Sequence, residues 1–242
     1  AIGDSASYAN TTGSFNTALG DRTLYANSTG EYNSGIGMKA LFTNTTGSYN
    51  AATGYTSLYS NTTGDYNVAS GTSALFSNTT GSYNVAIGAN SLFENTTGAE
   101  NTGIGLEALQ SNTTGSYNTA IGHRAMVSNT SGVGNTALGY YSLYDNQEGD
   151  ENVGLGYYAL YNSIGDDNTA VGYMAGSDTV GHGNVFLGHK AGAEETGSYK
   201  LYIGNSATNN LITGDFSTGD LELGQQSRGT VSVLRDLDVD GD

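Results

Sequence analysis

Tyrosine is the residue whose type and placement most suggest a binding function. The chain has 18 tyrosines, and many of them crowd into three successive repeats between residues 140 and 173. A flat aromatic ring offers a sugar or a protein a large contact area at low entropic cost. Tyr144 and Tyr161 share a column with phenylalanines and should be packed. The tyrosines that we expect to face outward and to form a surface binding patch are Tyr140, Tyr141, Tyr157 and Tyr158.

The three histidines are the next candidates for chemistry. Of His123, His182 and His189, only the first and last occupy the same place in the repeat. If several copies of the chain packed around a common axis, an axial histidine could meet its equivalents and hold a metal or an anion, but we expect surface or packing roles. Catalysis needs convergent groups outside the regular pattern, and we find none. We therefore predict a protein that is not an enzyme and has no cofactor.

Paired carboxylates occur at Asp150-Glu151, Asp166-Asp167 and Glu194-Glu195. Such pairs could bridge coils or chains through a structural Ca²⁺. The G-G-x-G-x-D pattern of calcium-binding solenoids is absent, however, and the aspartates at 236, 238 and 240 lack the glutamate that closes an EF-hand loop. We assign no metal ligand, and structural Ca²⁺ is the alternative.

Asparagine followed by x-Thr or x-Ser recurs through the chain. In some secreted proteins this triplet is a glycan acceptor, but it is also good turn chemistry, because asparagine tolerates left-handed φ and threonine hydroxyls bond the local backbone. Turn chemistry explains the periodicity, so we favour it. The asparagines concerned are Asn10, Asn27, Asn44, Asn61, Asn78, Asn95, Asn112 and Asn129.

The same segments carry a ladder of threonine pairs, which raises ice binding as an alternative function. The deciding question is whether the ladder forms a flat sheet or a set of corners, and the glycine after each pair favours corners. The pairs are Thr45-Thr46, Thr62-Thr63, Thr79-Thr80, Thr96-Thr97 and Thr113-Thr114.

All of these residues are positioned by a tandem repeat. One asparagine recurs every seventeen residues and then, twice, after sixteen. A fixed period of this size indicates one supersecondary unit stacked on its neighbours. We expect the asparagine side chains to form a ladder along the stack. Its members are Asn16, Asn33, Asn50, Asn67, Asn84, Asn101, Asn118, Asn135, Asn152, Asn168 and Asn184.

Each repeat contains two corner glycines, exemplified by Gly88 and Gly98. The runs between the corners are too short for helices, so we predict two short strands per coil joined by tight turns. The fold class is then an all-β parallel β-solenoid. About twelve coils at about 4.8 Å each give a rod about 55 to 60 Å long.

The strand columns are apolar on both faces. Ala or Gly is followed by Leu or Ile, as in Ala86-Ile87, although Thr53 and Ser70 interrupt the second column. Adjacent strand residues point to opposite sides, so one face can fill the coil's own core while the other needs a partner. A second apolar pair, such as Leu92-Phe93, poses the same problem. We infer that several copies of the chain pack side by side.

The pattern changes after residue 200. Short apolar segments recur ten residues apart, beginning at residues 201, 211, 221 and 231. We therefore divide the chain into a solenoid array at 1–199 and a β-rich neck at 200–242, which we expect to lead into a further domain.

The repeat core, seen at Asn84-Val85-Ala86-Ile87-Gly88 and Asn118-Thr119-Ala120-Ile121-Gly122, resembles the coil motif of trimeric autotransporter adhesin heads. The resemblance covers roughly residues 1 to 204. It implies three left-handed β-rolls side by side, although this repeat is longer than is usual in that family. The long repeat and the neck look more like phage tail-fibre and bacterial surface-fibre proteins, where such a neck commonly precedes an endosialidase-type intramolecular chaperone.

Charge narrows the function further. Seven Lys and Arg against 23 Asp and Glu give a net charge of -16, which repels nucleic acid and anionic lipid. No apolar run is long enough to insert into a membrane. We expect an extracellular homotrimeric fibre or adhesin segment, at a cell surface or on a virion, that acts as a stalk and contacts host glycans or proteins.

Overall fold

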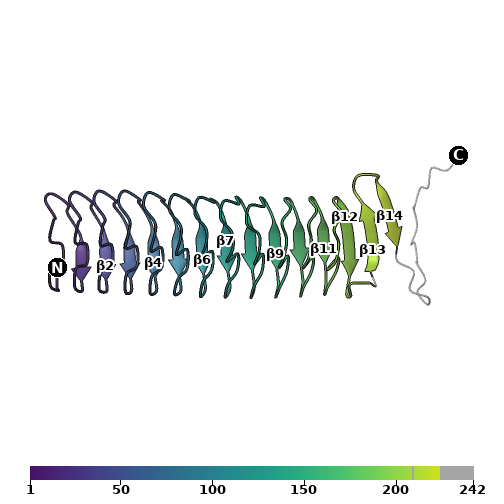
Figure 1. The fold of residues 1–242 in the computed structure, drawn as a ribbon, viewed down its shortest axis with the longest axis horizontal. Coiled ribbons are helices and arrows are strands. Elements are labelled where there is room, and N and C mark those ends of the chain that lie inside the picture. The colour runs from purple at the N-terminus through teal and green to yellow at the C-terminus, as the bar shows by residue number, and fades with distance from the viewer. Residues whose placement is uncertain (209, 224–242) are drawn as a thin grey trace, which may run out of the picture.

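The chain forms an elongated rod of stacked coils in the computed structural model, which describes residues 1–208 and 210–223 (Figure 1). Fourteen strands lie in chain order in a single sheet, and no helix occurs in the described residues. The predicted fold class, an all-β solenoid of 17-residue coils, is confirmed.

One strand comes from each coil, followed by three strands at the C-terminal end. The strands are β1 (Thr17–Leu19), β2 (Ser34–Ile36), β3 (Ala51–Thr53), β4 (Val68–Ser70), β5 (Val85–Ile87), β6 (Thr102–Ile104), β7 (Thr119–Ile121), β8 (Thr136–Leu138), β9 (Val153–Leu155), β10 (Thr169–Val171), β11 (Val185–Leu187), β12 (Lys200–Gly204), β13 (Asn210–Asp215) and β14 (Asp220–Leu223).

Neighbouring strands of the array pair in parallel, with residues one period apart as partners. Thr136 pairs with Val153 across a step of seventeen, and Val153 pairs with Thr169 across a step of sixteen. The shorter step comes from the second corner, where residues 163–165 replace the four-residue corner at 146–149. The period changes without any shift in strand register.

The prediction of two strands per coil is wrong, because the second run forms turns. Lys39 and Leu41 have φ angles of 59° and 52°, and left-handed residues two apart keep the chain from extending. Coil-to-coil bonds persist nevertheless. The Leu41 N–H donates to the Ser57 carbonyl at 3.0 Å. The second run therefore keeps regular hydrogen bonds from coil to coil, although it is not a β-strand.

The core is a narrow column of alanine and leucine. In β5, Ala86 is fully buried, and Leu92 packs in the same core from the turn run. Where a strand has glycine instead, the preceding coil fills the space with a hydroxyl residue. A Cβ on Gly103 would lie 2.6 Å from the Ser91 Oγ.

Phe186 of β11 is the largest fully buried side chain and stands in the alanine column. Its ring fits because the leucine column changes to glycine on either side of it. A Cβ on Gly176 or Gly192 would lie 2.5 Å or 2.1 Å from the ring. A larger side chain in the alanine column is thus offset by smaller residues in the leucine column, and the core stays filled.

The rod ends in an antiparallel cap. β12 pairs in parallel with β11 and antiparallel with β13, and β13 pairs antiparallel with β14. These three strands coincide with the first three apolar segments predicted for the neck. The predicted segment that begins at residue 231, and the aspartates at 236, 238 and 240, lie outside the described residues.

Candidate functional site

The asparagine column forms a hydrogen-bonded seam inside the rod. The Asn84 side-chain oxygen accepts the Asn101 backbone N–H at 3.0 Å, and its amide donates to the Gly98 carbonyl at 2.9 Å. The same pattern runs along the column from Asn16 to Asn184. The predicted ladder is present, but its bonds run chiefly to the backbone.

A second asparagine seam contains the x-Thr/Ser triplets. Asn61 and its equivalents are fully buried. The Asn61 amide donates to the Asn44 side-chain oxygen at 2.7 Å and to the Gly64 carbonyl at 3.0 Å. These amides are inaccessible to a glycosylating enzyme in the folded coil, except that Asn10 in the first coil is exposed. The triplets predicted turn chemistry at this column, but they did not predict that its side chains form a second ladder.

The outward side of β1–β11 is a continuous, uncharged surface, which we call the strand face. It consists of the first and third residues of each strand, which flank the buried middle residue. Every one of these residues is apolar or a serine or threonine. Ile87 is 41% exposed and Leu138 is 48% exposed. The column after the corner glycine adds further exposed apolar side chains beside it, including Met38 and Leu106.

The four candidate tyrosines lie together, but they are unequally exposed. Tyr140 and Tyr157 are exposed, whereas Tyr141 and Tyr158 are half-buried. Tyr140 stacks on Tyr157 with ring centroids 5.0 Å apart, and Tyr141 stacks on Tyr158 at 5.4 Å. These pairs cover ring faces, so the cluster presents mainly ring edges and hydroxyl groups. That arrangement favours hydrogen bonding over flat stacking on a sugar. Whether the cluster binds a ligand stays a prediction.

Desolvation by neighbouring rings raises the pKa of Tyr140 and Tyr158 above the usual value. Tyrosine hydroxyls are protonated at neutral pH even at their ordinary pKa of about 10, so these groups can donate as well as accept, and the shift extends that range to higher pH. At one edge of the cluster, Arg124 forms an ion pair with Glu107 and donates to the Tyr141 hydroxyl at 2.9 Å.

The histidines of the shared column close the tyrosine ladder at both ends. His123 stacks on Tyr140 with ring centroids 5.1 Å apart, and His189 stacks on Tyr173 at 5.0 Å. Their position is that of packing groups, as expected. His182 lies elsewhere, where its Nδ1 accepts the Asp166 backbone N–H.

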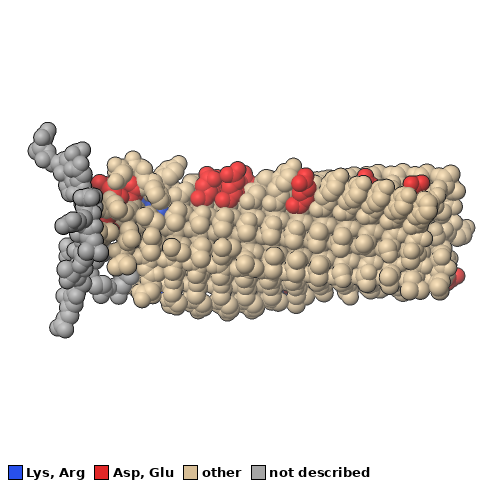
Figure 2. Space-filling model, turned by 180° about the vertical axis from the view of Figure 1, so that it is seen from behind, with Lys and Arg blue, Asp and Glu red and all other residues tan. Residues whose placement is uncertain are grey.

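Acidic side chains gather along one long edge of the rod, while the broad side seen in Figure 2 is nearly free of charge. Some of these carboxylates join neighbouring coils by accepting backbone hydrogen bonds. The Asp150 carboxylate accepts the Val133 backbone N–H of the preceding coil at 2.7 Å, and Asp166 accepts the Asp150 N–H at 2.9 Å. Within residues 1–208 and 210–223, no group of three or more metal-ligating side chains could hold an ion.

The threonine pairs lie in bends, not in strands. The Thr62 hydroxyl donates to the Thr79 carbonyl at 3.0 Å, whereas Thr63 is exposed. Each pair thus contributes one hydroxyl to the coil-to-coil bonding and one to the surface.

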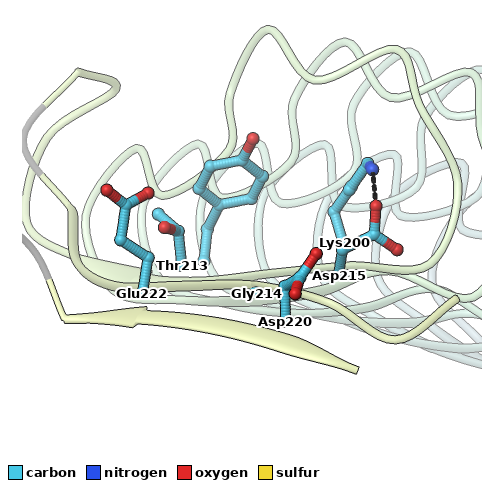
Figure 3. A pocket seen from close by; sticks show the side chains of 7 residues that line it. Lys200, Thr213, Gly214, Asp215, Asp220 and Glu222 are labelled. Carbon is cyan, nitrogen blue, oxygen red and sulfur yellow. Dashed lines mark hydrogen bonds and ion pairs between the residues drawn. The ribbon is translucent and has the colours of Figure 1, made fainter. Parts of the chain in front are cut away.

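A depression of about 240 Å³ lies over the cap, with Lys200, Thr213, Asp215 and Glu222 among its lining residues (Figure 3). Lys200 forms an ion pair with Asp215. This bond, aided by Ser217, holds the pKa of the Asp215 carboxyl well below its usual range.

Tyr202 also lines this depression, and its hydroxyl donates to Glu195. Burial and this bond raise the pKa of Tyr202 to about 12. The ion pair between Lys200 and Asp215 and the bond from Tyr202 to Glu195 are both made within the chain. The residues that line the depression therefore stabilise the cap.

No family model, curated protein or solved structure matches the chain. In the described part of the chain, no helix is long and apolar enough to cross a membrane.

Proposed function

We propose that this chain is a structural segment of an extracellular homotrimeric fibre or adhesin, in which three copies associate through their strand faces. The observation that carries the proposal is the strand face itself. It is uncharged and continuous along β1–β11, with side chains such as Ile87 and Leu138 more than one third exposed.

The dimensions of the strand face suit association along the whole rod. Eleven strands at about 4.8 Å give a strip about 50 Å long. A standard interface takes about 800 Å² from each partner, which a strip of this length reaches at a width of about 16 Å. Two strand columns are narrower than that. The neighbouring column that includes Met38 and Leu106 must therefore contribute.

The charge distribution supports the same arrangement. Large contiguous apolar surfaces on soluble proteins commonly mark interaction sites. Copies that met at the acidic edge would repel each other, whereas the strand face carries no charge. A trimer joined there keeps its acidic edges in solvent, where they are free to contact a host glycan or protein. Tyr140 and Tyr157 stand in the same column as Met38 and Leu106, so the trimer places these rings at the border of the contact.

The test is the mass of the protein in solution. Light scattering with size-exclusion chromatography should give a trimer for the unaltered chain, and a stable folded monomer would contradict the proposal. Ile87→Glu together with Ile121→Glu should convert the trimer to smaller species, because carboxylates would be buried at the interface. The matched control is Thr80→Glu with Thr114→Glu, which adds the same charge at exposed bends of the two preceding coils and should leave the trimer intact.

Ice binding is the second candidate, favoured by one observation. The second threonine of each pair, including Thr63 and Thr80, is exposed at the same point of successive coils. A thermal-hysteresis measurement on the purified chain decides it, since absence of hysteresis would eliminate this function and leave the fibre proposal untouched.

A further inference from the structure

Another aromatic ladder runs along the edge of the rod, and its first break is at Glu100. Its first five rings stack face to face with centroids 4.7 to 5.0 Å apart. The next positions of the column are Glu100, Tyr117 and Gly134. The backbone does not change at the break, since φ is 60° at Tyr83, 58° at Glu100 and 62° at Tyr117. The rings of the ladder are Phe15, Tyr32, Tyr49, Tyr66 and Tyr83.

The break uncovers ring faces that are hidden elsewhere in the ladder. Tyr49 and Tyr66 are 47% and 45% exposed, because each has a ring on both sides. Tyr83 and Tyr117 rise to 58% and 60%. A hollow of about 350 Å³ lies at this point and is lined by Tyr83 and Glu100.

We propose that Tyr83, Glu100 and Tyr117 form a binding slot for a quaternary ammonium group. At the ladder spacing, two coils separate the Tyr83 and Tyr117 rings by about 10 Å. A cation held between the outer edges of the two rings, clear of the Glu100 side chain that starts from the coil between them, lies about 5 to 6 Å from each centroid, inside the limit of about 6 Å for cation–π attraction. Its methyl carbons, about 1.5 Å from the nitrogen, then reach each ring at about 3.5 Å, which is optimal van der Waals contact.

Glu100 supplies the opposite charge. Its side chain is exposed, and in the described residues no Lys, Arg or His forms an ion pair with it. A small inorganic cation would gain the carboxylate but could not touch both rings. A methylated ammonium sheds its hydration easily and contacts all three groups, so the slot selects for apolar substituents on the cation.

The order ring, carboxylate, ring occurs once in this column of the described chain. After Tyr117 the column continues with Gly134, Glu151, Asp167 and Gly183 before the next ring at Tyr199. The repeat itself therefore supplies closed versions of the same site. Glu100→Tyr should fill the slot on a backbone that already carries tyrosine at six other positions of the column.

The experiment is a titration of the assembled protein with tetramethylammonium chloride, observed through the tyrosine ring signals by NMR. Sodium chloride at equal ionic strength is the reference. We expect saturable shifts confined to Tyr83 and Tyr117, weakened about threefold or more by Glu100→Gln and abolished by Glu100→Tyr. The matched control is Tyr49→Ala, which removes a ring from the closed ladder and should leave the binding unchanged.

Several results would overturn the proposal. Sodium shifts of equal size would reduce the effect to attraction by the acidic edge, and tighter binding of guanidinium would mark an arginine site instead. Unchanged binding by Glu100→Tyr, with circular dichroism confirming the fold, would place the ligand elsewhere. Choline and phosphatidylcholine vesicles then distinguish a free cation from a lipid headgroup as the source. Vesicle binding that Glu100→Tyr removes supports the headgroup.

Discussion

At the scale of the residue, the asparagine side chain bonds as a backbone peptide group does, because its amide both accepts and donates a hydrogen bond. The Asn84 side chain meets one backbone N–H and one backbone carbonyl at the corner, where the strand ladder cannot continue. Aspartate would lack the donor and serine would lack the reach. The column keeps asparagine because each buried backbone group at this seam needs a partner.

Asn84→Ala tests the energy of that seam. The change leaves the Asn101 N–H without its acceptor, whereas the Gly98 carbonyl keeps the Asn95 side-chain amide as a donor at 3.0 Å. One unsatisfied buried group costs about 1 to 3 kcal/mol, so we expect the free energy of unfolding, measured in urea at fixed protein concentration, to fall by about that amount. Asn10→Ala, at an exposed position, is the control. Equal losses for the two variants would mean that the buried bonds are not the cause.

Some residue-level features could be predicted from the sequence and others could not. A strict period predicts the Asn84 ladder, because only a stacked coil repeats one polar residue so regularly. Nothing in the sequence predicts left-handed φ at Leu41 or Tyr49, since both residues rarely adopt it. The covered ring faces of Tyr140 and Tyr157 also escaped prediction, because exposure of a ring depends on the coil above it.

At the scale of the element, a strand of three residues has no stability of its own. β5 exists because β4 and β6 flank it and because Ala86 is buried between them. The outward residues are then free to be selected for contact with another copy. Their column is interrupted at Thr53 and Ser70, in β3 and β4.

Thr53→Ile combined with Ser70→Ile should therefore strengthen the proposed trimer. Each change extends the apolar column, and buried apolar area contributes about 25 cal/mol per Å². We expect a rise of a few degrees in the melting temperature at fixed concentration. Thr46→Ile with Thr63→Ile places the same side chains at exposed bends and should produce no rise. An equal rise in both variants would point to propensity and not to association.

The cap provides a pH-dependent prediction. The folded-state pKa of Asp215 is depressed by Lys200, so its contribution to stability is present above the unfolded value of about 3.9 and is lost as the pH falls through the folded pKa. The NMR signals of β12–β14 should weaken below about pH 4, before those of the array. Asp215→Asn should loosen the cap at neutral pH and flatten this dependence, whereas Glu94→Gln, in an exposed array position, should not.

At the scale of the whole molecule, length is set in steps of one coil. The sequence predicts this property well, because the period fixes the register from residue 16 to residue 184. Periodicity does not predict the turns of the second run, because they depend on backbone angles. It does not predict the pairing of β12 with both β11 and β13 either, because that pairing depends on packing at the end of the rod.

Removal of residues 34–50 should delete one complete coil and leave the rest in register. We expect a folded rod shorter by about 4.8 Å, seen by small-angle X-ray scattering, with a melting temperature within a few degrees of the original. Removal of residues 34–42 instead joins a strand position to a corner position, and we expect cooperative melting to be lost. Cooperative melting of both deletions would contradict a register-locked array.

The coil-to-coil hydrogen bonds have a mechanical consequence. Bonds such as that from Leu41 to Ser57 join one coil to the next, so they run along the rod. A pull on the two ends therefore opens them one after another and does not shear them together. Each released coil pays out about 55 Å of chain at nearly constant force. Under tension the rod should therefore lengthen in steps of one coil, whereas a sheet whose strands run along the direction of pull has to break many bonds at once.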